Sequence, residues 1–212
     1  MSDPRFAHKL AGARCGTGAR SRRSATLSGM PRPWWQSRAN ALTALRALAA
    51  PALVAAILDQ ASVAAALLFA LAVVTDLADG RVARRYGEAT CVGGFLDHAT
   101  DALFVSAGLG ALAHEGLVPG LLPWLIAGAF VQYVVDSRAA AGRPLRASSL
   151  GRWNGIAYYV ALGIPVVRDS LGLGWPSAWL VQGFGWALVM STLVSMSERA
   201  LAWRRQRREP SG

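Results

Sequence analysis

The chain has 212 residues and a formal net charge of +10, from 22 Lys and Arg against 12 Asp and Glu. Hydrophobic residues make up 53% of the chain and charged residues only 16%, so long apolar runs separate the charges. This pattern is typical of a chain that crosses a bilayer rather than of a nucleic-acid-binding protein, whose surface carries many charges. It also excludes a disordered chain, and two cysteines alone, Cys15 and Cys91, cannot build a disulfide scaffold or a zinc motif.

The first 33 residues are rich in Arg, Gly and Ser and lack an apolar segment of signal-peptide length. We expect residues 1–33 to be a basic, disordered N-terminal extension that is not cleaved. Residues 34–203 are predicted to form one membrane domain. The basic residues 204–212 are predicted to form a cytoplasmic tail, which either contacts anionic lipids or only sets the topology.

Six apolar runs within this domain predict six transmembrane helices. Their expected bounds are 39–58, 61–86, 92–114, 119–140, 150–168 and 177–203. The runs are rich in Ala and Leu and show no alternation of polar and apolar residues, which excludes a β-barrel. The predicted fold is therefore an all-α integral membrane protein.

Arginines predict how these helices are oriented. The connections at 59–60, 114–119 and 168–176 contain one arginine, Arg168, whereas the two ends of the chain and the connections at 81–91 and 138–152 contain nearly all the others. Because basic residues accumulate on the cytoplasmic side, both termini and the connection between helices two and three are expected there. We expect a multi-pass protein of the inner (plasma) membrane.

Four aspartates lie close together in this apolar chain, within the stretch DLADGRVARRYGEATCVGGFLDHATD at residues 76–101. Asp76 and Asp79 are three residues apart, and Asp97 and Asp101 are four apart, so each pair shares a helix face. Carboxylates within a membrane segment are costly, and four of them repel one another unless cations neutralise them. Carboxylate oxygens suit hard cations, so we expect two Mg²⁺ or Mn²⁺ ions in the arrangement used for phosphoryl displacement.

Each aspartate taken alone has a simpler explanation, namely a helix cap or an ion pair with a nearby arginine. That alternative suits Asp79 but does not account for all four. Gly80 is expected to interrupt the second helix and to let a ligand approach the backbone. Arg84 could bind a phosphate, or it could belong only to the cytoplasmic excess of basic residues.

Two blocks of the sequence resemble one known family. The spacing Asp76-x2-Asp79-Gly80-x2-Ala83-Arg84-x8-Gly93-x3-Asp97-x3-Asp101 resembles the signature of the CDP-alcohol phosphotransferase (CDP-alcohol phosphatidyltransferase) family, class I. The run from Asn40 to Arg46, with Pro51, is similar to the first helix of the phosphatidyltransferase branch.

The resemblance implies roles for individual residues. Asp76 and Asp97 would bridge two metal ions, Asp79 would bind the first ion, and Asp101 would bind the second and act as the general base. The residues expected at the CDP part of the donor are Gly80, Arg84, Thr90, Asn40 and Thr43. A helix cap remains the alternative for Asn40, and a packing hydroxyl for Thr43. A homodimer is also implied by the resemblance.

The implied activity is an enzyme of phospholipid biosynthesis. It would transfer a phosphatidyl group from CDP-diacylglycerol to the hydroxyl of a polar alcohol, with metal ions, and release CMP. Arg138 and Arg152 are the candidates for binding a phosphate on the acceptor, such as glycerol 3-phosphate or inositol phosphate. His98 and Ala102 stand where phosphatidylglycerophosphate synthases usually have proline and lysine, so the acceptor stays open, and His98 could itself touch it.

Three other functions are compatible with parts of the pattern. The donor could be a CDP-linked small alcohol and the acceptor a lipid. A transporter could use buried aspartates, but it predicts inverted repeats, and all four aspartates lie in one hairpin. A membrane scaffold without activity leaves the aspartates unexplained. The expected partners are the two substrates and membrane lipids, with no nucleic acid.

Overall fold

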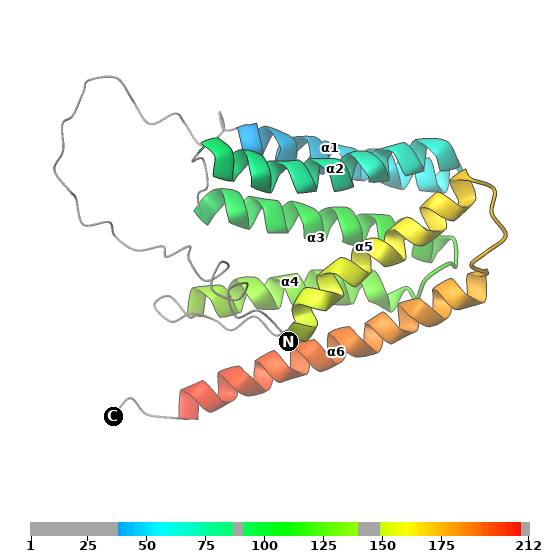
Figure 1. Cartoon of the computed structure of the whole chain (residues 1–212). Helices are drawn as coiled ribbons and strands as arrows, with labels where there is room; N and C mark the ends of the chain where they lie inside the picture. The colour runs from blue at the N-terminus through cyan, green and yellow to red at the C-terminus, as the bar shows by residue number, and fades with distance from the viewer. Residues whose placement is uncertain (1–37, 87–90, 140–148, 209–212) are drawn as a thin grey trace, which may run out of the picture.

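The computed structural model describes the backbone of residues 38–86, 91–139 and 149–208 and the side chains of residues 41–78, 94–136 and 150–204. These residues form six α-helices and contain no strand (Figure 1). The helices are α1 Arg38–Leu58, α2 Ser62–Tyr86, α3 Cys91–His114, α4 Leu121–Ala139, α5 Ser149–Ser170 and α6 Ala178–Arg208. The all-helical prediction is confirmed, and the predicted bounds of α1 to α5 agree to within about two residues.

Two local predictions were wrong. Helix α2 continues through Gly80 to Tyr86, so Gly80 does not interrupt it. A glycine costs about 1 kcal/mol in a helix, and the following Ala83, Arg84 and Arg85 are good helix formers that offset this cost. Helix α6 continues to Arg208, beyond its predicted end at residue 203, because arginine and glutamine extend an existing helix readily. A cytoplasmic tail at residues 204–212 stays a prediction.

Successive helices run in opposite directions, so the bundle has two ends (Figure 1). The connections at 59–61, 115–120 and 171–177 lie at one end, and helices α2, α4 and α6 terminate at the other. Helix α1 packs against α2 and α3, while α4 packs against α3 and α6. Helix α5 is tilted across the bundle and contacts α2, α3 and α6. This tilt carries residues of α5 past the polar side chains of α2 and α3.

The bundle is apolar both inside and outside. The core receives side chains from all six helices, and its most buried members include Leu53, Ala72, Phe104, Leu122, Leu162 and Val189. Large apolar side chains also face outward, with Leu48 73% exposed, Leu67 67% and Trp124 77%. Helices α1 and α6 contain stretches long and apolar enough to cross a membrane, Ala41–Leu58 and Ala178–Arg204, and Ser62–Ala78 and Leu121–Asp136 are shorter apolar helices. Six membrane-spanning helices stay a prediction.

A glycine allows three helices to meet closely in the core. A Cβ atom added at Gly108 of α3 would lie 2.8 and 3.0 Å from the two terminal methyl groups of Leu162 in α5, and 3.1 Å from Cδ2 of Leu53 in α1. These separations are shorter than normal carbon contacts, so glycine sets the distance between α1, α3 and α5.

We therefore expect Gly108→Val to destabilise the bundle by about 1–3 kcal/mol through overpacking. Gly110→Val is the matched control, because a Cβ atom at Gly110 meets nothing within 4 Å and the change in helix propensity is the same. Thermal unfolding of the two purified variants measures the difference. Equal melting temperatures would show that α1, α3 and α5 can separate at no cost.

Candidate active site

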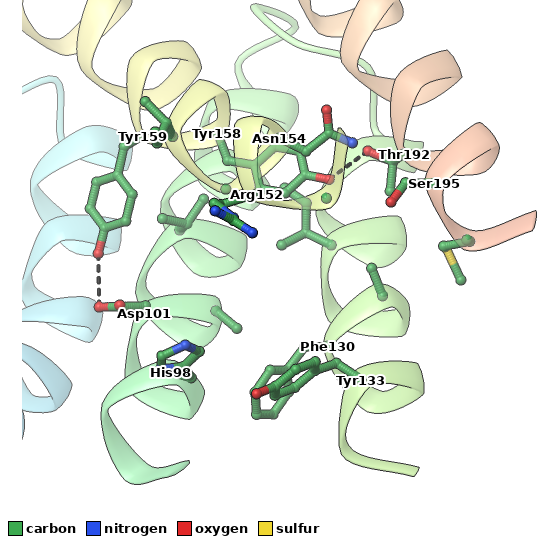
Figure 2. A pocket seen from close by; sticks show the side chains of 18 of the residues that line it. His98, Asp101, Phe130, Tyr133, Arg152, Asn154, Tyr158, Tyr159, Thr192 and Ser195 are labelled. Atoms are coloured by element: carbon green, nitrogen blue, oxygen red, sulfur yellow. Dashed lines mark hydrogen bonds between the residues drawn. The ribbon is translucent and has the colours of Figure 1, made fainter. Parts of the chain in front are cut away.

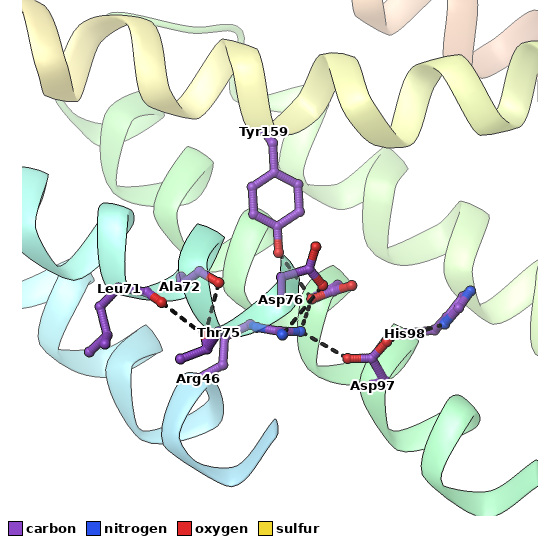
Figure 3. Close-up of polar contacts among 9 residues, drawn as sticks. Arg46, Leu71, Ala72, Thr75, Asp76, Asp97, His98 and Tyr159 are labelled. Carbon is purple, nitrogen blue, oxygen red and sulfur yellow. Dashed lines mark hydrogen bonds and ion pairs between the residues drawn. The ribbon is translucent and has the colours of Figure 1, made fainter. Parts of the chain in front are cut away.

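Three carboxylates converge on one buried arginine where α1, α2 and α3 meet (Figure 3). Nη2 of Arg46 lies 3.3 Å from Oδ1 of Asp76, and its Nη1 donates a hydrogen bond of 3.0 Å to Oδ1 of Asp97. Nη1 also pairs with Oδ1 of Asp101. The arginine side chain is 0% exposed, whereas Asp76 is 36% and the other two carboxylates are 26% exposed. The cluster is therefore closed on the side of α1 and open on the opposite side.

Helical spacing explains how these residues meet. Asp97 and Asp101 are one turn apart on α3, so both point to the same side of that helix. Asp76 reaches them from α2. Helix α1 packs against both α2 and α3 and carries Arg46 between them, so close packing of α2 on α3 is not needed. One turn of α2 is thus brought beside the first half of α3 by the packing of a third helix.

The chemistry of this cluster suits a divalent cation. Asp76, Asp97 and Asp101 each offer one carboxylate oxygen, and these three oxygens lie within 4.8 Å of one another. Hard cations such as Mg²⁺ prefer such oxygen ligands, often with water completing the coordination. The three described carboxylates therefore fit a divalent cation in kind of ligand, and the fourth predicted ligand, Asp79, lies outside the described side chains.

Tyr159 of α5 adds a contact that sequence analysis did not predict. Its hydroxyl donates a hydrogen bond of 3.0 Å to Oδ1 of Asp101 (Figure 2). The ring stacks against Phe104 with a centroid separation of 6.5 Å and contacts Phe69 at 6.4 Å. Oδ1 of Asp101 thus receives hydrogen bonds from both Arg46 and Tyr159, which fixes the orientation of the carboxylate.

A cavity of about 590 Å³ opens beside Asp101, between α3, α4, α5 and α6 (Figure 2). Much of its wall is apolar, with side chains such as Val105, Ile126 and Phe130. It is distinguished by its charged and polar groups, Asp76, His98, Asp101, Arg152, Tyr159 and Arg199, and we refer to it as the polar cavity. Acidic groups thus lie on one side of the cavity and two guanidinium groups are contributed by α5 and α6. Such a cavity suits a small polar molecule that carries negative charge.

Arg199 is held in this wall by packing. Its Cζ lies 5.9 Å from the ring centroid of Tyr133, and that ring is stacked with His98 at a centroid separation of 6.1 Å. A Cβ atom at Gly151 would lie 2.6 Å from Nη2 of Arg199, so the absence of a side chain at position 151 leaves room for the guanidinium. Sequence analysis did not identify Arg199, since one arginine near a helix end looks like a topology signal.

Uncharged polar groups line the same cavity between α5 and α6. The hydroxyls of Tyr158 and Thr192 are 2.6 Å apart, and Ser191 donates a hydrogen bond of 2.6 Å to Oδ1 of Asn154. Tyr158, Thr192 and Asn154 are all buried and all border the cavity. These contacts tie α5 to α6, so they fix the distance between the helices that carry the two arginines.

A second hollow begins at the same carboxylates but is apolar. This groove, of about 680 Å³, lies between α2 and α5. Asp76 and Tyr159 border both the groove and the polar cavity. The remaining wall of the groove is formed mainly by apolar side chains, including Phe69, Val73, Leu77, Val160 and Ile164. The carboxylates therefore lie where an apolar groove and a polar cavity meet.

The other residues that the sequence singled out fall into two groups. Thr43 is buried in α1, one turn before Arg46, and Arg152 is exposed at the polar cavity. The remaining predicted residues lie outside those whose side chains the structure describes, namely Asn40, Asp79, Gly80, Arg84, Thr90 and Arg138. Their predicted roles stay predictions.

Comparison with known proteins gives one family and one relative. A family model described as CDP-alcohol phosphatidyltransferase matches residues 36–195. A CDP-diacylglycerol–glycerol-3-phosphate 3-phosphatidyltransferase 2 of Arabidopsis thaliana is 31% identical over 137 residues, which are 63% of this chain and 54% of the relative. The chain thus spans about half the length of that relative. Since the family match covers about three quarters of the sequence, including the whole of the 76–101 motif, the chain belongs to the membrane-associated CDP-alcohol phosphatidyltransferase family of transferases.

Proposed function

We propose that this protein transfers a phosphatidyl group from CDP-diacylglycerol to the hydroxyl of a polar alcohol and releases CMP, with two Mg²⁺ or Mn²⁺ ions. The observation that carries the proposal is the carboxylate cluster at the junction of an apolar groove and a polar cavity. A reaction between a membrane lipid and a water-soluble alcohol needs both environments on either side of one reactive phosphate. Family membership supports the reaction type.

The proposed setting is the inner membrane, with six spanning helices. Outward-facing apolar side chains and the two long apolar stretches in α1 and α6 support it. The basic ends of the chain support a cytoplasmic location for both termini and for the active site. Residues 34–203 form the catalytic domain in this proposal, flanked by the basic segments 1–33 and 204–212. The family resemblance also supports a homodimer.

Asp76, Asp79, Asp97 and Asp101 would hold the divalent cations, and the family resemblance implies that Asp76 and Asp97 would serve both ions. Divalent cations held there supply positive charge beside the attacked phosphate and the departing CMP. The family resemblance supports Asn40, Thr43, Gly80, Arg84 and Thr90 as contacts of the CDP part of the donor. Thr43 lies on the same side of α1 as Arg46, one turn away, which is compatible with this proposal.

Asp101 is the proposed general base. The acceptor hydroxyl enters from the polar cavity that Asp101 borders. Arg46 and Tyr159 orient this carboxylate through Oδ1, and in the proposal the carboxylate takes the hydroxyl proton. The acceptor oxygen then bonds to the lipid-bearing phosphorus, the bond from this phosphorus to the bridging oxygen breaks, and CMP leaves with that electron pair.

The apolar groove favours a lipid donor. Asp76 borders the groove at its polar end, so a phosphate bound near Asp76 would have its acyl chain beside Leu77, Val73 and Val160. The polar cavity also has apolar walls, but it carries the guanidinium groups of Arg152 and Arg199 beside Asp101, which the groove lacks. With a small CDP-linked donor and a lipid acceptor, the acyl chains of the acceptor would instead have to lie in the apolar groove. The separation of the two hollows therefore supports CDP-diacylglycerol as the donor.

The acceptor is proposed to carry a phosphate, and glycerol 3-phosphate is the first candidate. Arg152 and Arg199 border the cavity and can bind a phosphate with charge-assisted hydrogen bonds, and Arg138 is proposed to assist from the end of α4. The name of the Arabidopsis relative supports this choice. His98 also borders the cavity. It follows the third aspartate, where phosphatidylglycerophosphate synthases usually have proline, and it is available to contact the acceptor.

Asp101→Asn should lower the rate of CMP release by a factor of about 10²–10⁴, the usual contribution of a general base. The assay uses purified protein, CDP-diacylglycerol, glycerol 3-phosphate and Mn²⁺ or Mg²⁺, and mass spectrometry identifies the lipid product. Asp59→Asn is the matched control, since Asp59 is exposed at the other end of the bundle. Full activity of Asp101→Asn would remove Asp101 as the base, and failure of the wild-type protein with every polar alcohol tried would contradict the proposed reaction.

Arg199→Met should raise KM for glycerol 3-phosphate by about 10–100-fold and leave KM for CDP-diacylglycerol unchanged. The loss of a hydrogen bond to a charged group costs about 1.5–3 kcal/mol, and 1.4 kcal/mol corresponds to a factor of ten. Arg204→Met is the control, because Arg204 lies on the same helix and is exposed. An equal rise in both KM values would indicate a general distortion of the site and would count against phosphate binding by Arg199.

Val160→Trp should fill part of the apolar groove and raise KM about tenfold for CDP-diacylglycerol with long acyl chains. A donor with six-carbon chains should be affected less, because it buries fewer methylene groups, each contributing about 0.8 kcal/mol. Val194→Trp provides the control, since Val194 is exposed on α6 and borders neither hollow. If chain length made no difference in Val160→Trp, the groove would not be the site of the acyl chain.

A further inference from the structure

Arg46 is completely buried at the centre of the carboxylate cluster. Its two terminal nitrogens contact Oδ1 atoms from α2 and α3, while its own backbone belongs to α1 (Figure 3). A buried guanidinium is stable only when it is paired, and Arg46 is paired with three carboxylates at once. It therefore binds the same side chains that the proposed function assigns to divalent cations.

The charges around Arg46 do not cancel. Asp76, Asp97 and Asp101 contribute three negative charges and Arg46 one positive charge, which leaves a net charge of −2 among these four residues. The guanidinium thus reduces the repulsion among the carboxylates but does not remove their attraction for a cation. Because the three oxygens lie within 4.8 Å of one another, a cation bound there would also be close to the guanidinium and would be repelled by it.

We propose that Arg46 is a positioning residue that holds the three carboxylates together and competes with divalent cations for them. In this role it lowers cation affinity and stabilises the cluster between cycles of cation binding. The inference rests on the proposed function, since it assumes that these aspartates bind the metal. Arg46 would then stabilise the cluster when no metal is bound and weaken the binding of a metal. An arginine that only supports the fold would not weaken metal binding.

The test is a titration of the purified full-length protein in nanodiscs with Mn²⁺, with free Mn²⁺ followed by electron paramagnetic resonance. Arg46→Met removes the charge but keeps much of the apolar stem, and it should bind Mn²⁺ at least tenfold more tightly than the wild type. Its melting temperature without added metal should fall, and Mn²⁺ should raise that temperature more than in the wild type. Arg46→Lys keeps the charge and should stay within about threefold of the wild-type affinity.

Two further variants separate an effect of the Arg46 charge from misfolding and from a general loss of positive charge. Arg46→Gln is a second neutral variant that retains a hydrogen-bond donor, and it should also bind Mn²⁺ more tightly if Arg46→Met does not fold. Arg204→Met, an exposed arginine on α6, should leave the affinity unchanged. Unchanged or weaker Mn²⁺ binding by the neutral variants, with normal binding by the wild type, overturns the inference about Arg46 alone. Absence of saturable Mn²⁺ binding by the wild type overturns the metal site itself and this inference with it.

Discussion

The arrangement of this protein depends on one buried electrostatic interaction, between Arg46 and the carboxylates of Asp76, Asp97 and Asp101. Carboxylates in an apolar bundle are stable only near positive charge, and removal of one partner from a buried charged pair costs about 3–5 kcal/mol. Here a single guanidinium connects α1, α2 and α3, and the hydroxyl of Tyr159 adds α5 through the same oxygen of Asp101. The same contacts therefore hold the charged site together and connect four of the helices.

The position of the cluster also determines what can reach it. Asp76 and Tyr159 border both the apolar groove and the polar cavity, so these two residues stand at the boundary between two environments. The Tyr159 ring is fixed by Phe69 and Phe104, and its hydroxyl is fixed by Asp101. Tyrosine suits this boundary, because its ring packs against apolar side chains while its hydroxyl reaches the charged cluster.

Much of the fold could be predicted from the sequence, and the reasons are local. Each helix contains a long apolar run that is visible in the sequence, and the four-residue spacing of Asp97 and Asp101 places both on one side of α3. Gly80 misled the prediction because the intrinsic preference of one residue is weaker than that of the helix around it. Tyr159 and Arg199 could not be found, since their contacts join helices far apart in sequence and a tyrosine in an apolar run resembles a packing residue. Arg46 was seen only as part of a motif, without its partners.

In the proposed function, the chemistry and the choice of acceptor belong largely to different parts of the chain. The described carboxylates lie on α2 and α3, whereas Arg152, Asn154 and Arg199, which border the polar cavity, lie on α5 and α6. Helix α5 contacts both parts, and its hydrogen bonds to α6 set the cavity while Tyr159 meets the cluster. Substitutions on α5 and α6 can therefore change the shape and charge of the cavity without touching a carboxylate. In the proposed function, the motif at residues 76–101 supplies the reaction, and the alcohol is selected by residues around the polar cavity, which include Arg152 and Arg199 on the last two helices and His98 on α3.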